Sequence, residues 1–84
     1  MAGYGIIEVD LHGLSAYDAR KRINSALRGA NSATYRIKCI HGYHSGTSIR
    51  DMIQDEFRYG RLPGVKRITM GDNEGITELI LREL

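Results

Sequence analysis

The sequence predicts an α/β fold, a two-layer sandwich in which a mixed four-stranded sheet carries two helices on one face. Short strand-like runs alternate with two segments of helical period, in the order β-α-β-α-β-β. The run at 34–40 alternates apolar with basic residues, which indicates one covered face and one face open to solvent. A short glycine-bounded segment at 71–75 joins the last two runs as a hairpin, so the final strand is antiparallel to its neighbour.

The first half of the chain predicts a strand, a helix and a second strand. The first strand covers 5–11. Ser15, with Asp18 three residues later, approximates a capping box, and the helix that follows ends near Gly29. Its apolar positions recur at helical spacing: Ala16, Ala19, Ile23, Ala26 and Leu27. The second strand covers 34–40 and places Tyr35, Ile37 and Cys39 on one face.

The second half predicts a helix and the hairpin. Thr47 or Ser48 caps a helix with an apolar stripe made of Ile49, Met52, Ile53 and Phe57. Gly60 and the turn at 62–64 end that helix. The hairpin strands cover 65–70 and 76–81. Because right-handed crossovers make the first three strands parallel, their carboxyl ends should meet at one edge of the sheet.

Composition indicates one small globular domain, with 84 residues, 42% hydrophobic and 26% charged. The net charge of +2 is too small to predict nucleic-acid binding by itself. The lone Cys39 allows no internal disulfide, which fits a reducing cytoplasm. No leader segment or membrane span is expected, so no membrane partner is predicted.

Two predicted strands end in a histidine and a glycine at the edge where open α/β folds bind ligands. Asp10 and His12 are two residues apart, so their side chains share a face and could form a carboxylate-oriented imidazole for general base chemistry or for metal ligation. The alternative is a pair that only anchors the loop into the helix. His41 ends the second run, and we expect it to join Asp10 and His12 in one cluster.

The segment from His41 to Ser48 is rich in glycine and small polar residues and leads into a helix start. Backbone amides and the helix dipole make such a place suitable for a phosphate, although an ordinary capped turn fits the pattern equally. Arg50 opposes the dipole in the first turn, a position easier to explain if it faces an anion. The predicted phosphate ligands here are Gly42, Gly46, Thr47, Ser48 and Arg50.

Arg36 and Lys38 on the open face are further candidates for phosphate contact. The basic residues of the first helix are interpreted as a solvated surface: Arg20, Lys21, Arg22 and Arg28. A zinc site through His12, His41 and His44 is disfavoured, since no cysteine accompanies them. Cys39 lies within a strand among apolar neighbours, so it is not expected to act as a nucleophile.

These motifs together resemble the Smr (small MutS-related) domain over nearly the whole chain, 1–84, as a single domain. Three segments carry the resemblance: 9–14, reading VDLHGL; 40–42, reading IHG, with Gly46-Thr47 and Ile49-Arg50; and the hairpin at 71–75, followed by Ile76-Thr77. The resemblance implies a fold similar to the C-terminal domain of translation initiation factor 3. It also implies a nucleic-acid-binding domain, in several members a nicking or single-strand endonuclease on DNA or RNA.

By this resemblance, Asp10 and His12 correspond to the family's acidic and histidine positions. His41, Gly42, Gly46 and Thr47 correspond to its glycine-rich phosphate loop. The chain departs from the family in the loop, where Tyr43, His44 and Ser48 replace small residues or glycine. The hairpin also departs, since it carries Asp72 and Glu74.

Two functions follow from the sequence. In the first, Asp10, His12 and His41 cleave a phosphodiester while the glycine loop and Arg50 hold the phosphate. A divalent metal on Asp10, with Asp72 or Glu74, is compatible with this chemistry but not required by it. In the second, the domain is a non-catalytic module that binds nucleic acid or a ribonucleoprotein and acts through a protein partner. No cofactor fingerprint supports a small-molecule enzyme.

Overall fold

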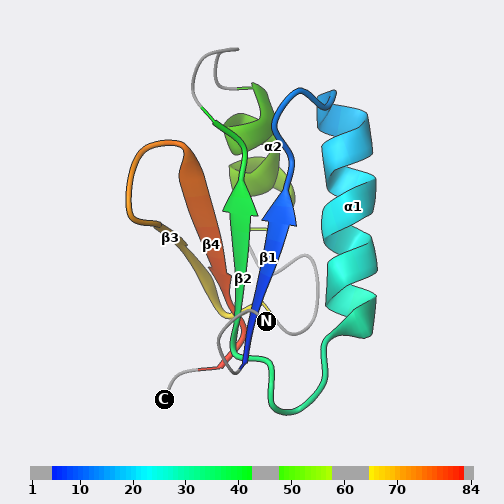
Figure 1. Ribbon diagram of the computed structural model, residues 1–84, viewed down its shortest axis with the longest axis vertical. Helices are drawn as coiled ribbons and strands as arrows, with labels where there is room; N and C mark the ends of the chain where they lie inside the picture. Colours follow the sequence, from blue (N-terminus) through cyan, green and yellow to red (C-terminus); the bar gives the residue numbers. More distant parts are fainter. Residues whose placement is uncertain (1–4, 43–47, 58–64, 83–84) are drawn as a thin grey trace.

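The computed structural model describes residues 5–42, 48–57 and 65–82. Figure 1 shows the predicted order of elements. Their bounds are β1 (Ile6–Asp10), α1 (Ala16–Gly29), β2 (Arg36–Ile40), α2 (Ser48–Phe57), β3 (Arg67–Met70) and β4 (Ile76–Ile80). None of the described helices is long and apolar enough to cross a bilayer.

The four strands form one mixed sheet in the order β1-β2-β4-β3. β1 and β2 are parallel, whereas β4 is antiparallel to both β2 and β3. β3 therefore points in the same direction as β1 and β2, as predicted. The strand ends at Asp10, Ile40 and Met70 lie at one edge of the sheet, which we call the carboxyl edge.

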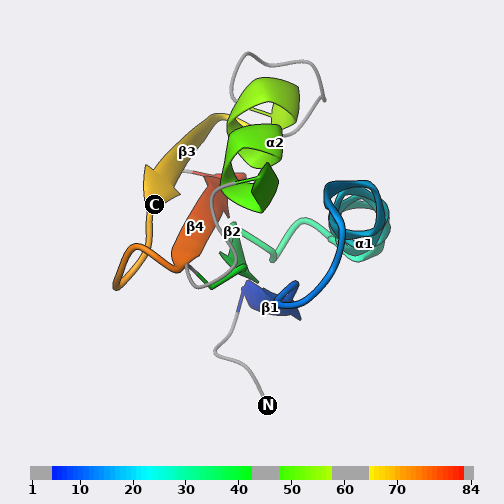
Figure 2. The same cartoon turned by 90° about the horizontal axis from the view of Figure 1, so that it is seen from above.

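Both helices cover the same face of the sheet, so the predicted two-layer sandwich is confirmed (Figure 2). The strand residues that face the helices are buried: Val9, Ile37, Cys39 and Leu79. The alternate residues of the same strands face the open side, among them Glu8, Arg36, Lys38 and Glu78. The core therefore lies between the sheet and the helices.

Local sequence explains both helices. The Ser15 hydroxyl accepts a hydrogen bond from the Asp18 backbone N–H at 3.1 Å, which caps α1 as predicted. In α2, Ile49, Ile53 and Phe57 recur every four residues and are buried on one side. The predicted cap at Thr47 and the predicted stops at Gly60 and 62–64 lie outside the described residues.

All four strands are shorter than the sequence pattern suggested; β4, for example, ends at Ile80 rather than at residue 81. β2 begins at Arg36 rather than at residue 34, because Thr34 closes a turn in which its N–H donates to the Asn31 carbonyl at 3.0 Å. β3 begins at Arg67 rather than at residue 65, although Lys66 still donates its N–H to the Ile80 carbonyl. β1 ends at Asp10, and the Leu11 N–H continues the pairing by donating to the Ile40 carbonyl at 2.8 Å.

Candidate nucleic-acid interface

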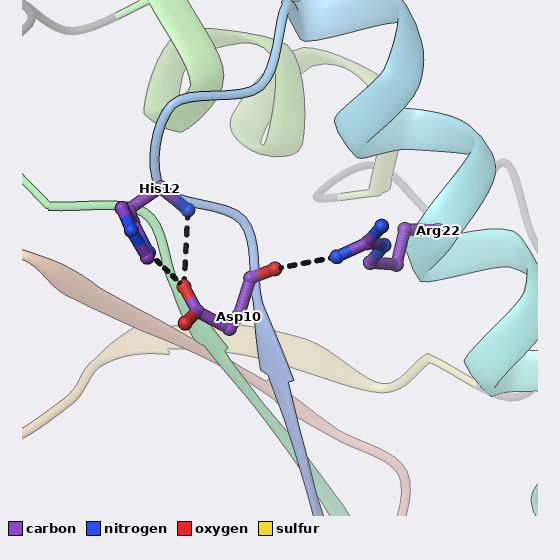
Figure 3. A network of polar contacts seen from close by, with 3 residues as sticks. All are labelled: Asp10, His12 and Arg22. Atoms are coloured by element: carbon purple, nitrogen blue, oxygen red, sulfur yellow. Dashed lines mark hydrogen bonds and ion pairs between the residues drawn. The ribbon is translucent and has the colours of Figure 1, made fainter.

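Asp10 and His12 form an exposed pair where β1 leaves the sheet (Figure 3). Asp10 Oδ1 lies 2.5 Å from His12 Nδ1 and also accepts the His12 backbone N–H at 3.2 Å. The chain turns immediately afterwards at Gly13, whose φ of 77° is the left-handed conformation that glycine tolerates. The side chains of His12 and Asp10 are 74% and 58% exposed. A substrate in solution can therefore reach both.

The pair sets the state of the imidazole. A carboxylate only accepts hydrogen bonds, so His12 Nδ1 carries the proton of that contact. The other ring nitrogen, Nε2, is then free in the neutral ring to accept a proton. The hydrogen bonds from His12 hold the pKa of Asp10 below its ordinary value of 3.8, the side-chain bond having the largest effect. Asp10 is thus a carboxylate at neutral pH, as an orienting group requires.

Arg22 from α1 completes the surroundings of this pair. Its Nη1 donates to the backbone carbonyl of Asp10 at 3.1 Å, across the gap between the helix and the strand (Figure 3). The interpretation of Arg22 as part of a solvated surface was therefore incomplete. This contact adds a positive charge close to the Asp10–His12 pair, on the side toward α1.

His41 lies at the same edge of the sheet but not in the same cluster. Asp10 is paired with Ile40, so His41 is in phase with Cys39, whose side chain faces the helices. Its ring is buried, with 4% exposed. Nδ1 lies 2.8 Å from the Gly42 carbonyl oxygen and Nε2 lies 2.7 Å from Thr77 Oγ1. The expectation of one cluster with Asp10 and His12 was wrong because the two histidines are on opposite faces of the sheet.

The described end of the glycine loop bonds to the hairpin. The His41 and Gly42 backbone N–H groups both donate to the Gly75 carbonyl, each at 2.9 Å. The Gly42 amide, predicted to contact phosphate, is therefore already occupied. Gly42 has a φ of 73°, which explains the glycine at this turn. Gly46 and Thr47 lie outside the described residues, and Ser48 is the exposed first residue of α2.

The two basic residues predicted on the open face are paired with carboxylates. Arg36 Nη1 donates to Glu78 Oε1 at 2.7 Å, and Glu78 is buried. Lys38 Nζ lies 3.7 Å from Asp72 Oδ2. Arg36 and Lys38 would have to exchange these partners before contacting a phosphate. The pairing with Lys38 also explains why the hairpin can carry Asp72, since the charge of this carboxylate is balanced by a basic partner.

Arg50 faces a groove of about 290 Å³ between α2 and the β3–β4 hairpin. We call it the hairpin groove, and the lining that matters below is Arg50, Gln54, Ile68, Met70, Glu74 and Thr77. Within the described residues, no hydrogen bond or ion pair joins Arg50 or Glu74 to another side chain. Of the three basic side chains predicted to contact phosphate, Arg50 is therefore the one that remains unpaired in the described part of the chain.

Metal ligation and cysteine chemistry find little support in the described segments. No group of three or more His, Cys, Asp or Glu there is placed to hold a metal ion. A zinc site through His41 would have to break its bond to Gly42 or Thr77, and His44 lies outside the described residues. Burial, with a smaller effect from Glu78, raises the pKa of the Cys39 thiol to about 12, so this cysteine is a poor nucleophile.

Thr77 and Glu78 contact candidate site residues, and the sequence analysis did not identify either contact. A polar residue such as Thr77, in phase with the buried Leu79, is a signal for a buried hydrogen bond. Glu78 has no such signal, because its partner Arg36 is 42 residues away in the chain. The role of Arg22 was hidden for a similar reason, since it depends on how α1 packs beside β1.

The arrangement of the backbone is similar to a solved structure, the Smr domain of MutS2 from Thermus thermophilus. The two match with a TM-score of 0.78 and 24% sequence identity, over 92% of this chain and 99% of that chain. No protein-family model matches the sequence, and a search of curated proteins found no match. The mixed sheet with two helices on one face, predicted from the sequence, is thus the fold of the Smr domain.

Proposed function

We propose that this chain is a nucleic-acid-binding domain that cleaves phosphodiester bonds, nicking a duplex or cutting a single strand. The observation that carries the proposal is the exposed Asp10–His12 pair at the carboxyl edge, with Nδ1 held by the carboxylate. An oriented, accessible imidazole is what general base catalysis needs. The backbone matches the Smr domain of MutS2 from Thermus thermophilus, and the sequence resemblance to Smr domains is what implies nucleic-acid binding.

In the proposed reaction, His12 Nε2 takes a proton from a water molecule, and the resulting hydroxide attacks the phosphorus. The bond from phosphorus to the leaving oxygen breaks, and that oxygen takes a proton from solvent water, while the imidazolium of His12 returns its own proton to the solvent. Asp10 stabilises the imidazolium that exists between these two transfers, because its carboxylate already contacts Nδ1. Water is consumed, one P–O bond forms and one breaks, and the pair returns to its starting state.

Positive charge near the pair would hold the substrate. Arg22 lies beside Asp10, and Arg50 lies in the hairpin groove at the start of α2. We retain Arg50 as a phosphate ligand, whereas Arg36 and Lys38 contribute only if phosphate displaces Glu78 and Asp72. His41 then positions the loop rather than reacting, since both of its ring nitrogens are bonded.

The lone buried cysteine supports a cytoplasmic location.

The second candidate is a non-catalytic module that binds nucleic acid or a ribonucleoprotein and recruits a protein partner. The observation that favours it is the engagement of His41 and Gly42 with Gly75 and Thr77, which removes part of the predicted phosphate loop from ligand contact. Binding through Arg50 and Arg22 does not need those groups.

Incubation of the protein with supercoiled plasmid and with single-stranded RNA separates the two candidates, in arms with added divalent metal and with chelator. We expect cleavage that is lost in His12→Ala and greatly reduced in Asp10→Asn. Glu8→Gln is the matched control, because Glu8 is exposed on the same strand and face, two residues before Asp10. Salt-dependent binding without cleavage in any arm would favour the non-catalytic module instead.

A further inference from the structure

The hairpin groove combines two charges of opposite sign with an exposed apolar side chain. Arg50 lies on the α2 side and Glu74 on the hairpin side, and neither is paired within the described residues. Met70, at the end of β3, is 65% exposed beside the half-buried Ile68. A ligand that satisfies this groove therefore needs an anionic group, a flat apolar surface and a hydrogen-bond donor.

A nucleotide has all three features. Its phosphate suits the guanidinium of Arg50, which binds such anions bidentately. The face of its base suits Met70, because a thioether packs well against aromatic rings. Its polar edge suits the carboxylate of Glu74, which only accepts hydrogen bonds. The groove volume of about 290 Å³ lies at the small end for ligand pockets, so it fits one nucleotide unit rather than a larger ligand.

We infer that the hairpin groove is a base-recognition subsite that prefers guanine in a single strand. Guanine presents two neighbouring donors, N1–H and the N2 amino group, to the two oxygens of one carboxylate. Adenine, cytosine and uracil each present a single donor flanked by an acceptor on that edge, and the acceptor would face the Glu74 carboxylate. The inference rests on the proposed function, since it adds a preference to the strand that the domain would bind.

The subsite also accounts for one of the two acidic residues by which the hairpin departs from the Smr domains that the sequence resembles. Asp72 and Glu74 are two residues apart, yet among the described residues only Asp72 has a basic side chain as partner, Lys38 on the open face. Glu74 lines the hairpin groove on the side of the helices. Thr77, which also lines the groove, is bonded to His41, so the wall of the subsite is fixed to the loop that precedes α2.

The test measures the affinity of the full chain for short uridine oligonucleotides that carry one central guanosine, inosine or adenosine, with DNA versions in parallel arms. Inosine lacks only the N2 amino group. We expect inosine to weaken binding about tenfold relative to guanosine, as the loss of one hydrogen bond to a charged group predicts. If inosine weakens binding equally in RNA and in DNA, the base is the recognised group. If it weakens binding in only one of them, that nucleic acid is the one the subsite recognises.

Glu74→Gln should reduce the difference between guanosine and inosine to less than about threefold, because one acceptor oxygen is replaced by a donor. Asp72→Asn is the matched control: it removes the same charge from the same hairpin but outside the groove, and should keep the preference. Strand binding without a preference for guanosine, or a preference unchanged in Glu74→Gln, would overturn the inference while leaving the proposed function standing.

If no oligonucleotide binds, the subsite is tested by titrating the protein with guanosine monophosphate. The amide NMR signals of Ile68, Met70 and Thr77 report binding. Shifts of these signals with guanosine but not uridine monophosphate would support the subsite although the proposed function had failed. An absence of shifts together with an absence of strand binding would overturn both.

Discussion

His41 Nε2 and Thr77 Oγ1 lie 2.7 Å apart in the buried side of the sheet, joining the end of β2 to the start of β4. The Gly42 carbonyl oxygen can only accept a hydrogen bond. His41 Nδ1, which contacts it, is therefore the nitrogen that carries the proton in the neutral ring. Nε2 must then accept the hydrogen bond from the Thr77 hydroxyl. The histidine of the second motif is thus a structural tie between the loop and the hairpin.

Thr77→Val should destabilise the fold by about 1–3 kcal/mol, because it leaves the buried Nε2 of His41 without a donor. The measurement is the free energy of unfolding from urea titrations. Thr69→Val is the matched control, because the Thr69 hydroxyl makes only a long, weak hydrogen bond among the described residues, 3.5 Å from the Met70 carbonyl oxygen. Equal effects of the two substitutions would show that the His41 contact adds nothing to stability.

His12→Ala should instead leave the free energy of unfolding within about 0.5 kcal/mol of the original, as expected for an exposed residue. The same substitution should abolish cleavage, so stability and activity separate at this histidine. A large loss of stability in His12→Ala would contradict this, because it would mean that the Asp10–His12 pair serves mainly to anchor the loop into α1.

The faces of the two histidines could have been derived from the sequence alone. Asp10 and His12 are in phase with Glu8 on the open face, whereas His41 is in phase with Cys39 on the covered face. Treating the two His-Gly strand ends as equivalent concealed this difference. The relative directions of the strands and the capping of α1 could be predicted because they follow from local patterns and from crossover handedness.

Other parts of the site could not be predicted from local patterns. The Arg36–Glu78 pair depends on the register between β2 and β4, where Arg36 lies opposite Ile80 and Lys38 opposite Glu78. Nothing near either residue in the sequence indicates that register. The hairpin groove likewise depends on the packing of α2 against the hairpin, which places Arg50 near Glu74.

The pKa of Asp10 gives a direct test of its contact with His12. His12→Ala should raise this pKa toward the ordinary value of 3.8, because the bond with the largest effect is lost. Arg22→Ala should raise the pKa of Asp10 less, since the charge of Arg22 lowers it only slightly compared with the His12 hydrogen bonds. Carboxyl carbon NMR signals across an acid titration measure both changes.

The sign of the stability effect follows from the lowered pKa. The folded state keeps Asp10 ionised at a pH where the unfolded chain binds a proton, so the contribution is complete above the unfolded pKa and is lost as the pH falls through the folded pKa. A pKa for Asp10 that stayed the same in His12→Ala would exclude the hydrogen bond as its cause.

Cys39 predicts a loss of stability at alkaline pH. Its folded pKa of about 12 lies above the ordinary 9.0, so between these values the unfolded chain loses a proton that the folded chain keeps. The contribution of the neutral thiol is therefore present below about pH 9 and decreases by about 1.4 kcal/mol per pH unit above it. Urea titrations at several pH values in that window should show a shallower decline for Cys39→Ala than for the original chain, and identical slopes would contradict the prediction.

Arg50 is the residue whose substitution should weaken nucleic-acid binding most clearly without affecting the fold. It is half-buried at the start of α2, and it opposes the helix dipole, so removing it costs no favourable helix interaction. Arg50→Ala should reduce the binding free energy by about 1–3 kcal/mol, the range for hydrogen bonds to charged groups. Arg50→Lys should recover part of this loss, because lysine retains the charge but lacks the planar fork.

The salt dependence of binding identifies the phosphate contact. If Arg50 binds a phosphate, its removal should make the slope of log K against log salt shallower by about 0.9 on duplex DNA or about 0.7 on a single strand. Arg28→Ala is the matched control, since Arg28 is an exposed arginine in the last turn of α1, at the end of that helix far from the carboxyl edge (Figure 1). Equal changes in slope for the two variants would mean that Arg50 acts only through net charge, and an unchanged affinity in Arg50→Ala would move the search for the phosphate contact to Arg22, beside the Asp10–His12 pair.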